Sequence, residues 1–487
     1  MSSTDTIFDV LFLGAGLSCI GAAYHLQKRH PRRTYAILEA REDLGGTWDL
    51  FRFPGIRSDS DLFTFGYEFK PWESEKRLAD GPEIKAYLAE TARENGIDRH
   101  IRYHHRVLRV SWSSAERLWR VSVKRGDTGQ AAELRARWIF SGTGYYRYDE
   151  GFTPRFEGRE RFRGPIVHPQ HWPADLDWTG RRLVVIGSGA TAVTMIPALT
   201  EKASHVTMLQ RTPTYILPVP ARDRLARRLR PWLGKRAAFA LARRFYIFLQ
   251  QFIYRFCQGY PDAARRVIRR INARLLPQGY PVDVHFNPPY APWNQRLCVA
   301  PDGDFFRVIR EGKASVVTDR IASFTETGIA LESGAHLDAD LIVTATGLNL
   351  LPFGGIELEV DGRRLKPPEV IAFKGTMLSG VPNLAFAMGY TSSSWTLKIG
   401  LLCEYFCRLL AYMDERGLEV CTPVADAAMP TRPMMDFGAG YVRRSLDELP
   451  RQGNAFPWLS SWNYAEDAKM FRRGALDDKH LRFTPAR

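Results

Sequence analysis

Several kinds of segment are absent from this sequence of 487 residues. No run of about 18 apolar residues occurs, which excludes a membrane-spanning helix. The first residues, MSSTDTIFDVLFLGAG, have neither a basic segment nor a cleavage site, so we expect a buried strand there and no signal peptide. No window has the composition of a disordered, low-complexity region.

Cysteine is scarce: the six residues form no CxxC pair, and no histidine cluster accompanies them. Cys403 and Cys407 lie one helical turn apart in an apolar stretch, where thiols act as small apolar side chains. This pattern argues against a disulfide scaffold and gives no support for a metal site. We therefore expect a cytoplasmic protein without bound metal.

Acidic residues are rare in one long segment. Residues 221–275 contain 15 Arg and Lys against two Asp, a local net charge of +13 within a total of +15. The basic residues alternate with apolar and aromatic ones at helical spacing. The segment is interpreted as a helical insertion with a solvated basic face, or as a surface for peripheral contact with an anionic membrane. A nucleic-acid surface is a third reading, but no such motif accompanies it, so we expect no nucleic-acid partner.

Two glycine-rich turns are present. The first, within FDVLFLGAGLSCIGAAYHLQKRHPRRTYAILEA, predicts strand, turn, helix and strand, with Gly14 and Gly16 in the turn and Glu39 ending the second strand. Glycines let the backbone approach a pyrophosphate at the helix N-terminus, and an acid at this position binds ribose hydroxyls. Cys19 replaces the third glycine, so the helix must pack against the strand with a thiol between them.

The second turn, GSGATA at residues 187–192, follows the apolar run RRLVVI. The next strand ends in Gln210-Arg211-Thr212, where Arg211 takes the place that Glu39 has in the first copy. A guanidinium there favours a 2′-phosphate, whereas a carboxylate favours a free ribose. The two turns together predict FAD at the first and NADPH at the second.

Between the turns, FRGPIVHPQHWP holds Phe162, Gly164, His168, Trp172 and Pro173 at fixed offsets. This pattern resembles the fingerprint of Baeyer–Villiger monooxygenases of the flavoprotein class with two dinucleotide folds. In that family the segment links the FAD and NADPH domains, and its histidine serves their relative movement more than the chemistry. We expect linker packing as the direct role of His168 and Trp172. The likeness covers nearly the whole chain and is greatest to the ethionamide-activating branch and to monooxygenases of long-chain ketones.

The resemblance and the turns together imply cofactor contacts, including a flavin-contacting loop that begins GGTW at Gly45. The expected FAD contacts are Gly14, Gly16, Ser18, Glu39, Gly46, Thr47, Trp48, Asp59 and Val107. The expected NADP contacts are Arg57, Ser58, Ser188, Gly189, Ala190, Thr191, Ala192, Arg211, Thr212 and Gln295. Gln295 stands where many members have Lys close to the 2′-phosphate, so we expect a weaker preference for NADPH over NADH.

The resemblance also implies Arg296 as the active-site arginine. A permanent cation there favours an anionic flavin peroxide and stabilises the oxyanion that develops on the substrate. Asp59 matches an acid near the flavin and is expected to orient Arg296 by a charge-assisted contact. Asp61, the second Asp of the same turn, is the rival for this role, with the other Asp capping the loop.

The expected function is NADPH- and O₂-dependent insertion of one oxygen next to a ketone carbonyl, giving an ester or lactone. A thioether or thioamide sulfur is a further substrate for the same chemistry. The alternative is an N- or S-hydroxylating flavin monooxygenase, in which Arg296 would be dispensable. A flavin-binding protein that acts mainly at a membrane is a third possibility.

The expected fold is α/β, with two Rossmann-like dinucleotide-binding domains and a helical insertion in the NADPH domain. Four aromatic residues are candidates for either the substrate pocket or the core: Phe305, Phe306, Trp395 and Trp458. The expected boundaries are residues 1–146 and 376–487 for the FAD domain, 147–213 and 312–375 for the NADPH domain, and 214–311 for the insertion.

Overall fold

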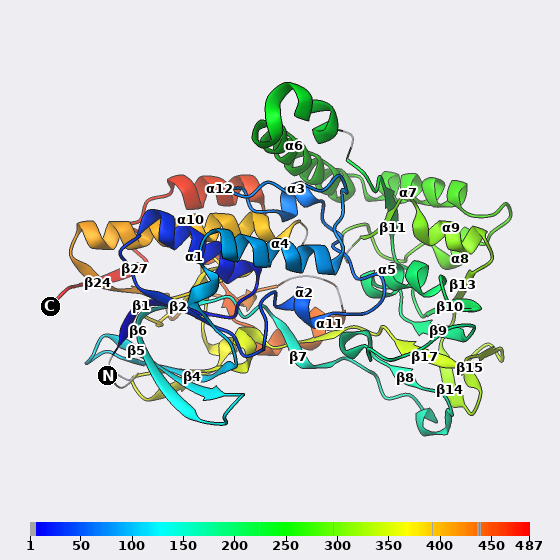
Figure 1. Cartoon of the computed structure of the whole chain (residues 1–487), viewed down its shortest axis with the longest axis horizontal. Coiled ribbons are helices and arrows are strands. Elements are labelled where there is room, and N and C mark those ends of the chain that lie inside the picture. The colour runs from blue at the N-terminus through cyan, green and yellow to red at the C-terminus, as the bar shows by residue number, and fades with distance from the viewer. Residues whose placement is uncertain (1–5, 224, 296, 392, 436–437, 439) are drawn as a thin grey trace.

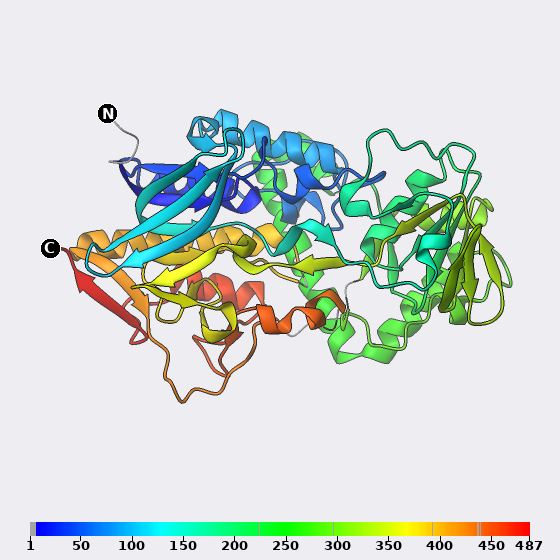
Figure 2. The same ribbon diagram turned by 90° about the horizontal axis from the view of Figure 1, so that it is seen from below.

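The structure is a computed structural model that describes residues 6–223, 225–295, 297–391, 393–435, 438 and 440–487. Figure 1 shows two lobes joined side by side. The first and last parts of the chain, blue to cyan and orange to red, build one lobe, and both termini lie there. Much of the middle of the chain, from teal-green to yellow-green, builds the other lobe, and the yellow segment that follows returns to the first (Figure 2). The predicted α/β class with two dinucleotide-binding folds is confirmed.

An eleven-stranded sheet forms the centre of the first lobe. Its main path is β20 (Arg363–Leu365), β19 (Glu357–Val360), β4 (His105–Ser113), β5 (Leu118–Arg125), β6 (Ala131–Ser141), β1 (Ile7–Leu13), β2 (Tyr35–Leu38) and β3 (Ile101–Arg102), and its side branch is β21 (Ala372–Phe373), β22 (Met377–Leu378) and β23 (Leu384–Phe386). The strands β6, β1, β2 and β3 run parallel. In β1, Val10 and Phe12 face one core and Leu11 and Leu13 face another. Both faces are buried, as is usual for parallel strands.

Helices cover one face of this sheet. The helices of the first lobe are α1 (Leu17–Arg29), α2 (Thr47–Leu50), α3 (Leu62–Phe65), α4 (Gly81–Glu94), α10 (Trp395–Glu415), α11 (Gly440–Arg444) and α12 (Tyr464–Arg473). Helix α10 packs against α1 and α12 and buries Cys403 in the same core as Phe12 of β1, and Cys407 is buried as well. The two thiols thus fill apolar space, as their spacing predicts. All six cysteines are buried and unbridged.

The second lobe contains a five-stranded parallel sheet. Its order is β13 (Ala314–Thr318), β10 (His205–Gln210), β9 (Arg182–Ile186), β17 (Leu341–Thr344) and β8 (Ile166–Val167). Helices α5 (Ala190–Leu199) and α9 (Asp304–Arg310) share a core with one face. The antiparallel strands β14 (Ile321–Thr325), β15 (Gly328–Leu331) and β16 (His336–Asp338) share a core with the other. This sheet positions the second glycine-rich turn between β9 and α5.

Short two-stranded ladders complete the fold. They are β7 (Tyr146–Gly151) with β18 (Leu348–Leu350), β11 (Ile216–Val219) with β12 (Cys298–Pro301), β24 (Leu418–Pro423) with β27 (Leu481–Pro485), and β25 (Arg432–Pro433) with β26 (Arg451–Gln452). The ladder of β7 and β18 carries both chain crossings between the lobes. It therefore fixes the two folds to each other.

The basic segment forms helices α6 (Leu225–Gly259) and α7 (Pro261–Leu275), followed by the short α8 (Val282–His285). Gly234, with φ +71° and ψ 169°, interrupts α6, so the element is two helices joined at a kink. The predicted helical insertion thus exists. Within the described ranges, no helix combines the length and apolarity that a membrane crossing needs.

The sheets place two domain boundaries differently from the prediction. Strands β19 and β20 join the sheet of the first lobe, so the chain returns to it between Thr344 and Glu357 and not at residue 376. Strand β12 pairs with β11, and α9 packs in the core of the second sheet, so the second domain resumes before residue 312. Both errors involve short strands and a short helix, whose sequence periodicity is too brief to assign.

Candidate active site

The first glycine-rich turn joins β1 to α1. Gly14 has φ +92°, in the region that favours glycine, and a Cβ there would lie 3.1 Å from the carbonyl oxygen of Gly142. A Cβ on Gly142 would in turn collide with Sγ of Cys19. The thiol at the third position is therefore accommodated by the absence of a side chain on Gly142. The turn's backbone remains open at the N-terminus of α1, where a pyrophosphate is favoured.

Glu39 follows β2 and is buried beside this turn. Its carboxylate accepts hydrogen bonds from the backbone N–H of Ala15, at 2.7 Å, and of Arg41, at 3.0 Å. Burial raises the pKa of Glu39, and these two hydrogen bonds oppose the shift. A carboxylate held in this way has acceptor capacity left for a ribose hydroxyl.

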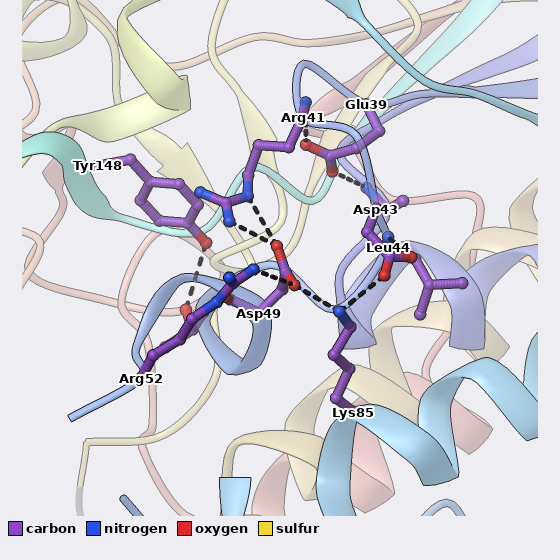
Figure 3. Close-up of polar contacts among 10 residues, drawn as sticks. Glu39, Arg41, Asp43, Leu44, Asp49, Arg52, Lys85 and Tyr148 are labelled. Carbon is purple, nitrogen blue, oxygen red and sulfur yellow. Dashed lines mark hydrogen bonds and ion pairs between the residues drawn. The ribbon is translucent and has the colours of Figure 1, made fainter. Parts of the chain in front are cut away.

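An ionic cluster next to Glu39 was not predicted from the sequence (Figure 3). The buried carboxylate of Asp49 accepts a hydrogen bond from Nε of Arg41 at 3.1 Å and one from Nζ of Lys85 at 2.6 Å. Lys85 also pairs with Asp43 at 2.7 Å. These residues come from α2, α4 and the loop after β2, so no motif joins them in the sequence. They fix the loop that starts at Gly45 against the first turn.

Tyr148 contacts the loop that starts at Gly45. Its hydroxyl lies 3.3 Å from Oγ1 of Thr47 (Figure 3), and burial raises the pKa of Tyr148 to about 12. A Cβ on Gly46 would lie 3.3 Å from both the Tyr148 hydroxyl and Cα of Gly16. The backbones of the two glycines thus lie close together, with little room for a side chain on Gly46.

A cavity of about 750 Å³ joins the two lobes. This volume lies in the upper part of the range for small-molecule sites. Of the predicted contacts, its lining includes Gly14, Gly16, Ser18, Glu39, Gly46, Thr47, Trp48, Arg57, Ser58, Asp59, Val107, Ala190, Thr191 and His168. The predicted NADP contacts that do not line it are Ser188, Gly189, Ala192, Arg211, Thr212 and Gln295. One end of the cavity is therefore the first turn, and the start of α5 borders its other side.

The second turn is held to the end of β10. Oγ of Ser188 donates a hydrogen bond to the carbonyl oxygen of Thr212 at 2.9 Å. Arg211, one residue earlier, is exposed, and a Cβ on Gly189 would meet no atom within 4 Å. The backbone at Gly189 is accessible to a phosphate, and the role of Arg211 toward a 2′-phosphate stays a prediction.

The loop from Arg57 to Asp61 forms one wall of the cavity and joins the two lobes. Nη1 of Arg57 donates to Oδ2 of Asp304 at the start of α9, at 2.6 Å. Asp61 caps α3 by accepting from the backbone N–H of Thr64 at 3.0 Å, is buried, and does not line the cavity. Asp59 lines it. This placement favours Asp59 over Asp61 as the acid near the flavin.

Arg296, the predicted catalytic arginine, lies outside the described residues. Its predicted contact with Asp59 stays a prediction. The neighbouring Gln295 is half-buried.

The fingerprint residues occupy the junction between the lobes. Nδ1 of His168 accepts the backbone N–H of Gln170 at 3.1 Å, so Nε2 carries the proton and donates to the carbonyl oxygen of Gly347 at 3.1 Å. Burial lowers the pKa of His168, which keeps the imidazole neutral. A Cβ on Gly151 would collide with this ring. His168 therefore ties the linker to the returning chain.

Three of the other fingerprint residues make close contacts within the second lobe. Phe162 is buried in the core over the second sheet, and a Cβ on Gly164 would lie 2.6 Å from the carbonyl oxygen of Asp340. Trp172 packs edge-on against Trp178 at 5.6 Å, and Pro173 is exposed. The described geometry agrees with a linker role for the segment.

The four aromatic residues that were candidates for the pocket or the core lie in different environments. Trp395 lines the cavity, and its Nε1 donates to Oγ of Ser18 at 3.1 Å, which links α10 to the first turn. Phe305, Phe306 and Trp458 are core residues. No periodic signal distinguishes these cases, because both environments favour large apolar rings.

The chain matches the family model described as flavin-binding monooxygenase-like over residues 75–375, and residues 13–72 match an NAD(P)-binding Rossmann-like domain. The chain belongs to the flavin-binding monooxygenase family. It is 51% identical over 477 residues to the FAD-containing monooxygenase EthA of Mycobacterium tuberculosis, covering 98% of this chain and 97% of that protein. It is 45% identical to the probable FAD-binding monooxygenase AlmA of Acinetobacter baylyi, covering 98% of this chain and 96% of that protein.

Solved structures share the fold of this flavin-binding monooxygenase. An oxidized steroid monooxygenase bound to NADP superposes with a TM-score of 0.79 at 22% identity, covering 99% of this chain and 100% of that one. An open structure of cyclohexanone monooxygenase gives a TM-score of 0.77 at 20% identity, covering 98% and 99%. At these identities the likeness shows a shared architecture of two dinucleotide folds.

The residues of the first turn fit a flavin dinucleotide. Gly14, Gly16 and Gly46 line the cavity without side chains, Glu39 lines it with a carboxylate, and Trp48 and Val107 add apolar lining. The cavity then continues to Ala190 and Thr191 at the second turn.

Proposed function

We propose that this monooxygenase holds FAD at the first turn and NADPH at the second, and that it uses O₂ to insert one oxygen next to a ketone carbonyl. The product is an ester or a lactone. The 51% identical relative is named an FAD-containing monooxygenase, and the steroid monooxygenase structure contains NADP; these relatives support the two cofactors.

One observation carries the proposal: a single cavity is bordered by both dinucleotide-binding turns and by the loop from Arg57 to Asp61. Hydride transfer requires the nicotinamide and the flavin to meet in one space. When bound and reduced, the flavin supplies the activated oxygen. The chain itself contributes binding and orientation.

Specific residues support these tasks. Glu39 binds the ribose of the first nucleotide, and Arg211 with Thr212 selects the 2′-phosphate of the second. Arg296 is proposed to stabilise negative charge on the substrate oxygen, with Asp59 orienting it. In other enzymes, a preorganised donor in such a position lowers the activation free energy by about 3 kcal/mol. The fingerprint from Phe162 to Pro173 favours ketone over amine oxygenation.

The second candidate function is N- or S-oxygenation, including oxidation of a thioether or thioamide. The family match by itself accommodates this reaction, since it extends over residues 75–375 without distinguishing substrates. The two candidates differ in their need for Arg296. Attack on a carbonyl builds negative charge on the carbonyl oxygen, whereas transfer of oxygen to sulfur does not.

The test compares products from the FAD-loaded enzyme given NADPH, O₂ and either 2-decanone or methyl phenyl sulfide. We expect an ester from the ketone, detected by gas chromatography with mass spectrometry. Arg296→Ala is expected to lower ester formation by at least about a hundredfold while NADPH still reduces the flavin. Arg307→Ala, on the exposed side of α9, is the matched control. Sulfoxide without ester, unchanged in Arg296→Ala, would establish the second candidate.

The proposed partners are therefore a small ketone, thioether or thioamide and O₂. We also propose peripheral contact with an anionic membrane through residues 221–275.

A further inference from the structure

The outward face of α6 carries an apolar stripe. Leu241, Phe245, Phe248 and Phe252 follow one another at spacings of four, three and four residues, which places them on one side of a helix. Their exposed fractions are 45%, 46%, 67% and 57%. Trp232, before the kink, is 86% exposed. We call the four residues from Leu241 to Phe252 the α6 stripe.

The opposite face of α6 is fixed to the first lobe. The ring of Tyr246 stacks on Phe63 of α3 at 5.3 Å, and Nη1 of Arg243 donates to the carbonyl oxygen of Phe63 at 2.6 Å. Nε2 of Gln250 donates to Oδ2 of Asp61 at 2.6 Å, and Oγ of Ser393 donates to Oε1 of Gln250 at 2.7 Å. The helix is thus held in one orientation, and the α6 stripe points away from the fold because the other side is occupied.

The charged residues of α6 itself all have one sign. Helix α6 contains eight basic residues and no acidic residue. Glu73 pairs with Lys235 at 3.0 Å, and Glu68 pairs with Arg472 at 2.9 Å. The exposed basic residues of the helix are Arg227, Arg228, Lys235, Arg236, Arg244 and Arg255. An apolar stripe flanked by basic side chains is the pattern of a helix that lies in the interface of an anionic membrane.

A groove of about 700 Å³ runs beside the stripe. Phe239, Ile247 and Phe248 give it an apolar side, and Arg236 and Arg244 stand on its border. A phospholipid presents the same two chemistries, an acyl chain and a phosphate. The groove therefore extends the apolar and basic surface that the stripe begins.

We propose that the α6 stripe and the surrounding arginines are a docking surface for an anionic lipid bilayer. Figure 1 shows α6 standing out from the body of the protein, where a flat surface could reach it. A second copy of this chain is disfavoured as the occupant, since stripe-to-stripe packing would bring two sets of eight basic residues together. The inference rests on the membrane contact in the proposed function but not on the ketone reaction.

Docking there would place the bilayer next to the cavity wall. Gln250 connects α6 to Asp61 and to Ser393, and Ser393 lines the cavity, as does the loop up to Ser60. The surface and the candidate active site are therefore separated by the thickness of a single helix. This arrangement favours apolar substrates that partition into lipid.

The experiment is vesicle flotation of the FAD-loaded full chain. Vesicles contain either phosphatidylcholine alone or equal parts of phosphatidylcholine and phosphatidylglycerol, at low and high salt. The combined variant Phe245→Ser, Phe248→Ser and Phe252→Ser is compared with a control that changes exposed apolar residues elsewhere: Leu108→Ser, Val284→Ser and Val424→Ser. Retention of flavin absorbance shows that each variant is folded.

We expect binding to the anionic vesicles, weakened by high salt, and a loss of about tenfold or more in the stripe variant but not in the control. The pair Arg236→Gln and Arg244→Gln should weaken binding without changing any apolar residue, which tests the surface independently should the stripe variant fail to fold. Equal binding by the stripe and control variants would overturn the proposal. So would absence of binding, or lipid-free self-association that the stripe variant abolishes. Ester formation is measured separately, so failure of the ketone reaction leaves this result unaffected.

Discussion

The two dinucleotide-binding turns of this chain differ in how closely their surroundings enclose them. The first glycine of each turn is closely packed: a Cβ would lie 3.1 Å from the carbonyl oxygen of Gly142 at Gly14 and 2.2 Å from that of Ala345 at Gly187. The difference is at the second glycine, where Gly16 lies against Gly46 but a Cβ on Gly189 would meet nothing within 4 Å. An enclosed site suits a cofactor retained through many turnovers, and an open site suits one that exchanges. We therefore expect the same local fold to serve two different residence times.

The largest expected change in stability comes from removing the ionic cluster, which supports the first turn but not the second. Burial raises the pKa of the Asp49 carboxyl, but hydrogen bonds from Lys85 and Arg41 lower it more, so its pKa lies below the ordinary value for Asp. Asp49→Asn should reduce the free energy of unfolding by about 3 kcal/mol at neutral pH, because it removes the buried carboxylate that accepts charge-assisted hydrogen bonds from Arg41 and Lys85. Urea unfolding measures this change.

The pH dependence of this effect has a definite sign. A carboxyl whose pKa is lower in the folded than in the unfolded state stabilises the fold above its unfolded pKa of about 3.9, and the contribution is lost as the pH falls through the folded pKa. The difference between wild type and Asp49→Asn should therefore shrink below about pH 4. Asp127→Asn, which removes an exposed partner of Arg125, is the control and should have little effect at any pH. A difference that persisted unchanged at low pH would contradict the role of the Asp49 charge.

A second expected effect concerns the packing of the turns themselves. Gly142→Ala should destabilise the protein by about 2 kcal/mol and weaken flavin retention, because the new Cβ would collide with Cys19. Gly189→Ala, at the open turn, should leave the free energy of unfolding unchanged. Adding Cys19→Gly to Gly142→Ala should restore stability. Thermal unfolding with flavin fluorescence checks all three variants, and equal losses at Gly142 and Gly189 would show that the two turns are packed alike.

The third prediction concerns which nucleotide the open turn selects. Arg211→Ala should lower kcat/KM for NADPH about tenfold, since one charge-assisted contact to the 2′-phosphate contributes about 1.5 kcal/mol. The value for NADH should not change. Arg181→Ala, at a half-buried arginine of the same domain, is the control. Equal losses with both nucleotides would assign Arg211 to folding and not to selection.

The smallest expected effect is an increase in the preference for NADPH over NADH. Gln295→Lys should raise the preference for NADPH over NADH about threefold, because an exposed charge contact is worth less than 1 kcal/mol. The gain should decrease with added salt. Steady-state kinetics with both nucleotides measure it, and Gln295→Met controls for the length of the side chain. An equal gain with Met would attribute the effect to packing.

The α/β class and the first nucleotide fold could be predicted because their signals are local. Gly14, Gly16 and Glu39 belong to one strand–turn–helix–strand unit, and the strand predicted before Glu39 is present as Tyr35–Leu38. The predicted difference between the two copies, Glu39 in the first and Arg211 in the second, is local in the same way. The likeness at Phe162 to Pro173 supplied the linker and the family.

The sequence by itself determined the two turns, the acid and the guanidinium that distinguish them, and the basic composition of α6. Only the tertiary structure decided that Arg41, Asp49 and Lys85 meet behind the first turn, that His168 binds the carbonyl of Gly347, and that the α6 stripe faces outward. The physical reason is separation along the chain: a turn is specified by neighbours in sequence, whereas these contacts join residues from distant elements. Their formation depends on how the sheets and helices pack, and no short pattern records it.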